Sequence, residues 1–234
     1  MKIFAISDLH YFKDQRPEDN TRHGQYAVEL LKKSIIMANE VVKPDIFLAA
    51  GDMIDRPEEP QLLEDLAGLF NDLKMPFLVI PGNHDPAPEI FYRTMPQVPE
   101  YLDVKGFRFI PFPYDKETPG WNACREKSEI DKLNRLNKDL PVIMFQHVPV
   151  FKPGRVGCFY NYDNVQEIFE NCENVVLSIS GHWHFGYCPS FSAPFASIAV
   201  PSLCEERYAV STIELAENGE ITRFQVDYLN VDGE

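Results

Sequence analysis

The feature of this sequence that most restricts its fold is an alternation of short apolar runs with longer amphipathic segments. The apolar runs have the length and composition of buried β-strands and lie at residues 2–7, 45–51, 77–82, 107–112, 142–146 and 175–181. The amphipathic segments carry apolar residues at helical spacing and lie at residues 24–42, 61–73 and 125–139. Strands that alternate with helices in this way are typical of an α/β fold.

The pattern changes toward the carboxyl end of the chain. Three strand-like runs follow one another without a helix between them, at residues 195–200, 208–215 and 221–229. An Asn-Gly dipeptide separates the last two and favours a tight hairpin turn. We therefore predict that the three runs form an antiparallel meander and that the sheets of the fold are mixed. Two proline-containing stretches are expected to be long surface loops, at residues 86–99 and 111–120.

Length, charge and cysteine usage limit the architecture and the possible partners. A chain of 234 residues without an internal repeat or linker fits one domain, residues 1–234. Its formal net charge of -14 repels polyanions and disfavours a main role in binding duplex nucleic acid. No stretch is long and apolar enough to span a bilayer, so no membrane partner is expected. The five cysteines form no Cys-x-x-Cys pair, which favours a reducing compartment, and we predict a cytoplasmic location.

Five of the strand-like runs end in residues whose side chains bind metal ions in proteins. In chain order these ends are Asp8-Leu9-His10, Asp52, Asn83-His84-Asp85, His147 and His182-Trp183-His184. In α/β folds, sites form at the carboxyl ends of strands, which is where these residues fall. Each motif alone is weak, and a lone histidine after an apolar run is more often structural. The joint occurrence is informative, because five of the six histidines belong to this ordered set.

The candidate ligands form a chemically coherent set of carboxylate, amide and imidazole groups. They are Asp8, His10, Asp52, Asn83, His147, His182 and His184. A mixed nitrogen and oxygen set without thiolate suits Mn, Fe, Zn or Co. Seven ligands are too many for one tetrahedral ion but are enough for two divalent ions if one carboxylate bridges them. Two metals about 3.5 to 4 Å apart can clamp both the attacking and the leaving oxygen of a displacement at phosphorus.

The ordered motifs resemble those of the calcineurin-like metallophosphoesterase family. They are Asp-Leu-His at 8–10, Gly-Asp-Met-Ile-Asp-Arg at 51–56, Gly-Asn-His-Asp at 82–85, His147 and Gly-His-Trp-His at 181–184. The resemblance implies a four-layer sandwich of two mixed sheets flanked by helices. It also implies a di-metal centre that hydrolyses phosphodiesters or phosphomonoesters through a metal-activated hydroxide. By the same pattern, Asp8, His10 and His184 hold the first ion, Asn83, His147 and His182 hold the second, and Asp52 bridges them.

The resemblance also implies roles for three residues that are not metal ligands. His84 matches a histidine close to the scissile phosphate, where an imidazolium can donate a hydrogen bond or proton to the leaving oxygen. Asp55 matches the acid that orients this histidine in the protein-phosphatase branch. Arg56 matches a phosphate-contacting arginine of that branch. The Gly-His-Trp-His motif points instead to the smaller bacterial-type phosphodiesterases and nucleases.

Three functions remain open within this resemblance. The first is a phosphodiesterase that acts on a small molecule, such as a cyclic nucleotide, a glycerophosphodiester or a nucleotide-like substrate. The second is a DNA exonuclease or endonuclease of the SbcD and Mre11 type, which the acidic charge and short chain disfavour. The third is a scaffold that has lost catalysis, which the complete set of motifs opposes.

Specificity is expected to come from the loops around the metal ligands. The loop at 149–165 offers aromatic and basic groups, although aromatic residues of this kind most often serve to pack a loop. These groups are Phe151, Lys152, Arg155, Phe159, Tyr160 and Tyr162. His23 lies outside the motifs and is expected to be a solvated loop residue, with lining of the substrate entrance as the alternative.

Overall fold

The computed structural model describes residues 1–14, 21–113, 116–118, 122–136, 138–150, 173–190 and 195–231. Within these residues no helix is long and apolar enough to cross a membrane.

One sheet has five strands and joins the two ends of the chain. Its strands are β1 (Lys2–Ile6), β2 (Ile46–Ala49), β3 (Phe77–Val79), β12 (Ala209–Leu215) and β13 (Ile221–Tyr228), in the order β13-β12-β1-β2-β3. Strands β1, β2 and β3 run parallel, whereas β12 is antiparallel to both of its neighbours. The sheet is therefore mixed, as the sequence predicted.

The second sheet has six strands and is also mixed. Its strands are β4 (Leu102–Val104), β5 (Phe107–Phe112), β8 (Val142–Gln146), β9 (Val175–Ser180), β10 (Tyr187–Ser190) and β11 (Ala196–Ala199), in the order β10-β11-β9-β8-β5-β4. The four central strands are parallel and the two edge strands are antiparallel to their neighbours. A separate short hairpin consists of β6 (Lys116–Thr118) and β7 (Asn122–Cys124).

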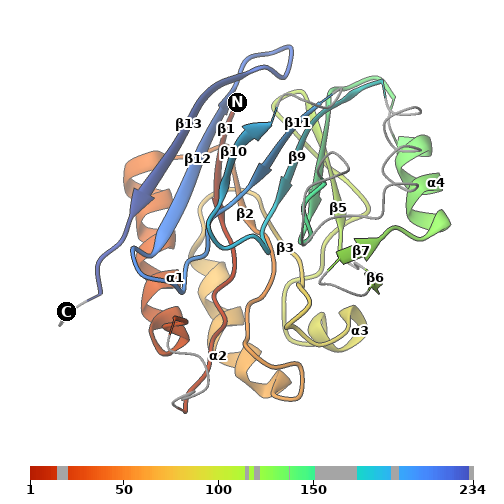
Figure 1. Ribbon diagram of the computed structural model, residues 1–234. Helices are drawn as coiled ribbons and strands as arrows, with labels where there is room; N and C mark the ends of the chain where they lie inside the picture. Colours follow the sequence, from red (N-terminus) through yellow and green to blue (C-terminus); the bar gives the residue numbers. More distant parts are fainter. Residues whose placement is uncertain are drawn as a thin grey trace.

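Helices cover the outer faces of the two sheets (Figure 1). Among the described residues these helices are α1 (Ala27–Ile36), α2 (Leu63–Ala67), α3 (Pro88–Phe91) and α4 (Lys127–Leu136). Buried residues of α1 recur at i, i+3, i+4, i+7 and i+8, which places one apolar stripe against the five-stranded sheet. Short 3-10 and π-helical turns extend α1 and α2, so that the helical segments span most of the ranges expected at 24–42 and 61–73.

Alternating side chains of the strands build the four layers. In β1, Phe4 and Ile6 pack beneath α1 and α2, while Ile3 and Ala5 point into the core between the two sheets. In the second sheet, Phe145 joins the same central core, and Met144 packs on the opposite face near α4. The fold is the sandwich of two mixed sheets that the sequence predicted.

Two expectations about the chain's connections were wrong. The run at 195–200 does not join an antiparallel meander, because β11 pairs in parallel with β9 in the six-stranded sheet and only β12 and β13 form a hairpin. Its apolar pattern suits either sheet, so the pattern did not identify its neighbour. The stretches at 86–99 and 111–120 are not simply loops, since they contain α3, the end of β5 and strand β6.

Candidate metal centre

The backbone turns sharply after the parallel strands, at the positions of several candidate ligands. Asp8, His10, Asp52 and His182 have positive φ angles of 55°, 44°, 53° and 67°. Such angles are uncommon for residues other than glycine and recur at functional sites that the surrounding structure holds in place. Gly82 permits the close approach of these turns, because a Cβ atom there would lie 2.2 Å from Asp52 Oδ1.

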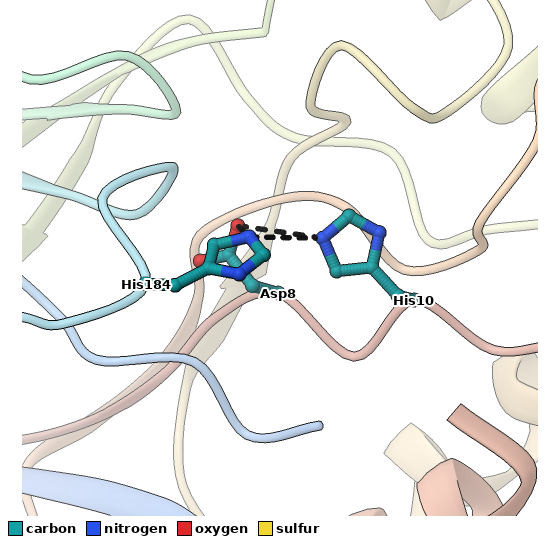
Figure 2. Close-up of side chains that lie close together, drawn as sticks. All are labelled: Asp8, His10 and His184. Carbon is teal, nitrogen blue, oxygen red and sulfur yellow. Dashed lines mark hydrogen bonds and ion pairs between the residues drawn. The ribbon is translucent and has the colours of Figure 1, made fainter. Parts of the chain in front are cut away.

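The first group of candidate ligands brings Asp8, His10 and His184 together (Figure 2). The Nε2 atoms of His10 and His184 are 3.2 Å apart. Asp8 Oδ1 lies 3.5 Å from His184 Nε2 and 3.9 Å from His10 Nε2. Asp8 and His10 are fully buried, so these donor atoms converge away from bulk water.

The second group consists of Asp52, His147 and His182, with Asn83 beside it. His147 Nε2 lies 3.2 Å from His182 Nδ1 and 3.1 Å from Asn83 Oδ1. Asp52 Oδ2 lies 3.3 Å from His147 Nε2 and 3.5 Å from His10 Nε2 of the first group. Asp52 therefore sits between the two groups.

Hydrogen bonds outside the groups orient two of the imidazoles. The Nδ1–H of His147 donates to the carbonyl oxygen of Ala50 at 2.7 Å. The Nδ1–H of His184 donates to the carboxylate of Glu205 at 2.5 Å. A carbonyl or carboxylate can only accept, so Nδ1 carries the proton in both rings and Nε2 can offer its lone pair to a metal.

The electrostatics of the two groups favour ionised carboxylates. Burial acts to raise the pKa of Asp52, but the imidazoles of His147 and His10 hold it well below its usual value. Burial likewise opposes protonation of His147, yet Asp52 and Asp8 raise its pKa to about 10. Divalent cations that bound here would take the place of protons on the histidines, because a ligating imidazole must be neutral.

His84 lies at the junction of the two groups but contacts them differently. Its backbone N–H donates to Asp52 Oδ1 at 2.8 Å, and its Nδ1 lies 2.8 Å from the carbonyl oxygen of Asp55. This hydrogen bond to residue 55 is made to the main chain, and the His84 ring also lies edge-on to His10 in a third cluster of potential metal-binding groups, which comprises His10, Asp55 and His84. The Asp55 carboxylate lies 3.4 Å from His10 Nδ1 and accepts a hydrogen bond of 2.9 Å from Arg22. That Asp55 orients His84 through its side chain stays a prediction.

A cavity of about 290 Å³ opens onto both groups. Its lining residues are Arg22, Asp52, Asn83, His84, His182, Trp183, His184, Phe185 and Glu205. Arg56, which the resemblance assigns to the substrate phosphate, is exposed and is not part of this lining. The six aromatic and basic residues named in the 149–165 loop lie outside the described residues.

Sequence reasoning missed three residues around the site. Neither Arg22 nor Glu205 belongs to a motif. The only signal in the sequence is that both residues lie in loops near strand ends. Asp85 was visible in the Gly-Asn-His-Asp motif but had no assigned role. Its buried carboxylate accepts hydrogen bonds from the backbone N–H groups of Met53, Ile54 and Gly82, which ties together the two loops that carry Asp52 and Asn83.

The expectation that His23 is solvated holds only in part. The residue is half-buried, and its Nδ1 lies 2.8 Å from the hydroxyl group of Tyr208. Its backbone N–H donates to the carbonyl oxygen of Cys204. These contacts join the segment after residue 20 to the segment that carries Glu205.

The sequence pattern of the calcineurin-like phosphoesterases matches residues 1–186, which include every candidate ligand. The chain belongs to this family. Its members are metal-dependent hydrolases that use a binuclear centre of divalent ions. The donor set fits such a centre, because two adjoining groups of nitrogen and oxygen atoms share Asp52.

Solved structures with the same fold include a dimetal phosphatase from Danio rerio. It is 14% identical, with a TM-score of 0.72 over 92% of this chain and 93% of that chain. A protein from Thermus thermophilus is 16% identical, with a TM-score of 0.68 over 97% of this chain and 98% of that chain. No curated protein sequence matches the chain. At these identities the likeness concerns the fold alone.

Proposed function

We propose that this protein hydrolyses a phosphodiester, or a phosphomonoester, in a small-molecule or nucleotide-like substrate. The observation that carries the proposal is the pair of adjoining ligand groups that share Asp52 and face one cavity. A cavity of about 290 Å³ suits part of a small substrate rather than a duplex. The net charge of -14 also favours a small substrate over DNA.

In this proposal the two groups hold one divalent ion each. Asp8, His10 and His184 would hold the first ion, Asn83, His147 and His182 would hold the second, and Asp52 would contribute to both. Bound divalent ions supply Lewis-acid polarisation of phosphoryl oxygens and lower the pKa of water. The hydrogen bonds from His147 to Ala50 and from His184 to Glu205 hold the imidazoles in the orientation that ligation needs.

His84 acts on the leaving oxygen in the same proposal. Its Nδ1–H is engaged by the carbonyl oxygen of Asp55, which leaves Nε2 as the atom that can serve the substrate. In the imidazolium form, Nε2–H donates a hydrogen bond or a proton to the oxygen that departs. The hydrogen bond from the His84 backbone to Asp52 fixes the ring beside the ligand groups.

We also propose that Arg22, rather than Arg56, contacts the substrate phosphate. The Arg22 side chain lines the cavity, is 22% exposed, and is held by its ion pair with Asp55 at 2.9 Å. A guanidinium matches the geometry of phosphate oxygens and keeps its charge at all physiological pH values.

Replacing Arg22 by alanine is expected to lower kcat/KM about tenfold to a hundredfold. This is the effect expected when one or two charge-assisted hydrogen bonds to the substrate are lost. Arg56→Ala serves as the matched control and is expected to leave kcat/KM close to the wild-type value. Steady-state kinetics of the metal-loaded variants measures both. A larger loss in Arg56→Ala than in Arg22→Ala would restore the assignment drawn from the resemblance.

A panel of phosphate esters tests the proposed function. Metal-loaded protein is incubated with cyclic nucleotides, glycerophosphodiesters, nucleotides, and single- and double-stranded DNA, and released product is quantified. We expect turnover of a small ester to exceed turnover of DNA. Preferential cleavage of DNA would establish the nuclease alternative, and no hydrolysis with any ester and any of Mn, Fe, Zn or Co would favour the inactive scaffold.

The remaining expectations concern the whole chain. We propose that residues 1–234 form one domain, which the pairing of β1 with β12 supports because it joins both ends of the chain in one sheet. The cysteine usage supports a reducing, cytoplasmic environment.

A further inference from the structure

A second and larger hollow adjoins the metal-site cavity. It has a volume of about 680 Å³ and shares His184, Phe185 and Glu205 with that cavity. We call it the lateral groove; Phe185, Pro201 and one face of β13 line it. Its volume falls within the range of about 300 to 1,000 Å³ that is usual for small-molecule sites. A ligand bound at the candidate metal centre could therefore extend into the groove without leaving the protein surface.

The floor of the lateral groove is an apolar strip on an edge strand. Phe224, Val226 and Tyr228 occupy alternate positions of β13, so their side chains share one face. Two of their three neighbours on β12 are small, with Ala209 opposite Tyr228 and Ser211 opposite Val226, whereas Ile213 lies opposite Phe224. Small residues beside large ones leave the hollow unfilled. β13 is the outermost strand of its sheet, which keeps the strip open.

Phe185 is the most unusual residue of the groove. The residue is 85% exposed although it follows His184 directly. Its ring packs against Trp183 in an edge-on arrangement, with ring centroids 5.9 Å apart. Stacking a planar ligand on an aromatic ring that is exposed to water beside the candidate catalytic groups is favourable in free energy.

Polar groups around the apolar strip restrict the chemistry of the ligand. Thr21 and His23 line one part of the groove, and the carboxylates of Glu205 and Glu206 outnumber the guanidinium of Arg207. A purely aliphatic ligand would displace water from these polar groups without offering hydrogen bonds in exchange, which is costly. A ligand with several phosphate groups would meet the two carboxylates. A neutral planar group that carries hydroxyl and N–H donors satisfies both conditions.

We infer that the lateral groove binds the nucleoside-like ester group of the substrate while the phosphate lies at the metal centre. The inference rests on the proposed function, which it deepens by naming the substrate's organic part. Phe185 stacks on the base, the β13 strip covers the other apolar surface, and Glu205 and Glu206 accept hydrogen bonds from hydroxyl or amino groups.

Two non-hydrolysable phosphonates test the inference. The 5′-methylenephosphonate analogue of adenosine monophosphate and ethylphosphonate share a head group and differ in the organic part. Calorimetric titration of the Mn²⁺-loaded protein measures the Kd of each. We expect the nucleoside compound to bind at least about tenfold more tightly, the contribution typical of one stacked base.

Variants of Phe185 distinguish the loss of stacking from a general loss of ligand binding. Phe185→Ala is expected to weaken the nucleoside compound about tenfold and to leave ethylphosphonate unchanged, whereas Phe185→Trp retains the preference. Tyr101→Ala is the matched control, because Tyr101 is a 41% exposed aromatic residue that does not line the groove. Equal Kd values for the two phosphonates in the wild type, or an equal loss of both in Phe185→Ala, would overturn the inference.

The binding experiment can fail or succeed independently of the test for hydrolysis. If the ester panel shows no hydrolysis but the phosphonates differ as expected, the proposed reaction fails and the nucleoside site stands. If esters are hydrolysed and the phosphonates bind equally, the reaction stands and the groove has another role.

Discussion

Replacing Asp52 by asparagine is expected to abolish metal-dependent hydrolysis of bis-p-nitrophenyl phosphate, with a loss of kcat/KM well above the roughly hundredfold caused by removing an outer-sphere partner. The reason is the position of the carboxylate, whose Oδ2 lies 3.5 Å from His10 Nε2 and 3.3 Å from His147 Nε2. Asparagine keeps the shape of the side chain but removes the negative charge that would offset two neighbouring cations. Metal content by mass spectrometry is expected to fall together with activity.

His147→Ala tests the same centre from its second group. Loss of this buried imidazole removes the nitrogen that faces Asp52, Asn83 and His182. Asp131→Asn, on the exposed face of α4, is the control for a change of one carboxylate elsewhere. Circular dichroism checks that each variant is folded. Full activity in both Asp52→Asn and His147→Ala would refute the two-metal proposal.

The second large effect is expected for His84→Ala, which should lower kcat about a hundredfold to ten-thousandfold, the range typical of a lost general acid. Metal content should stay at the wild-type level, because His84 Nδ1 is engaged by a carbonyl oxygen, its backbone N–H donates to Asp52, and its ring meets His10 edge-on. Kinetics and metal analysis of the same preparation measure the two quantities together.

The leaving group provides a sharper control for His84. A good leaving group such as p-nitrophenolate needs little proton donation, whereas an alkoxide needs much more. The loss in His84→Ala should therefore be smaller for p-nitrophenyl esters than for alkyl esters. An equal loss for both would remove the proton-donor role, and loss of metal would make His84 a ligand.

Much of the site could be predicted because it depends on local sequence. A buried strand must end where its apolar run ends, and the parallel strands of a sheet share the edge at which they end. The residues that follow β1 and β2 therefore lie together at the edge of one sheet, and those that follow β8 and β9 at the edge of the other, even though they are far apart along the chain. The apolar runs and the order of the motifs contain this information.

Other features depend on contacts between distant segments that carry no local signal. β11 pairs with β9 rather than with β12, and its apolar sequence is compatible with either sheet. Arg22 faces Asp55, and Glu205 holds His184, although neither belongs to a recognisable motif. Arg56 shows the reverse case, since its motif is present but its side chain is exposed away from the lining of the cavity.

The sequence alone determined the alternating α/β architecture, the candidate ligands and the family resemblance, because periodicity and ligand chemistry are properties of short segments. The tertiary structure decided which groups adjoin each other, which arginine lines the cavity, and where the lateral groove lies. Those features arise from the face-to-face packing of the two sheets, and packing depends on side chains that are remote in sequence.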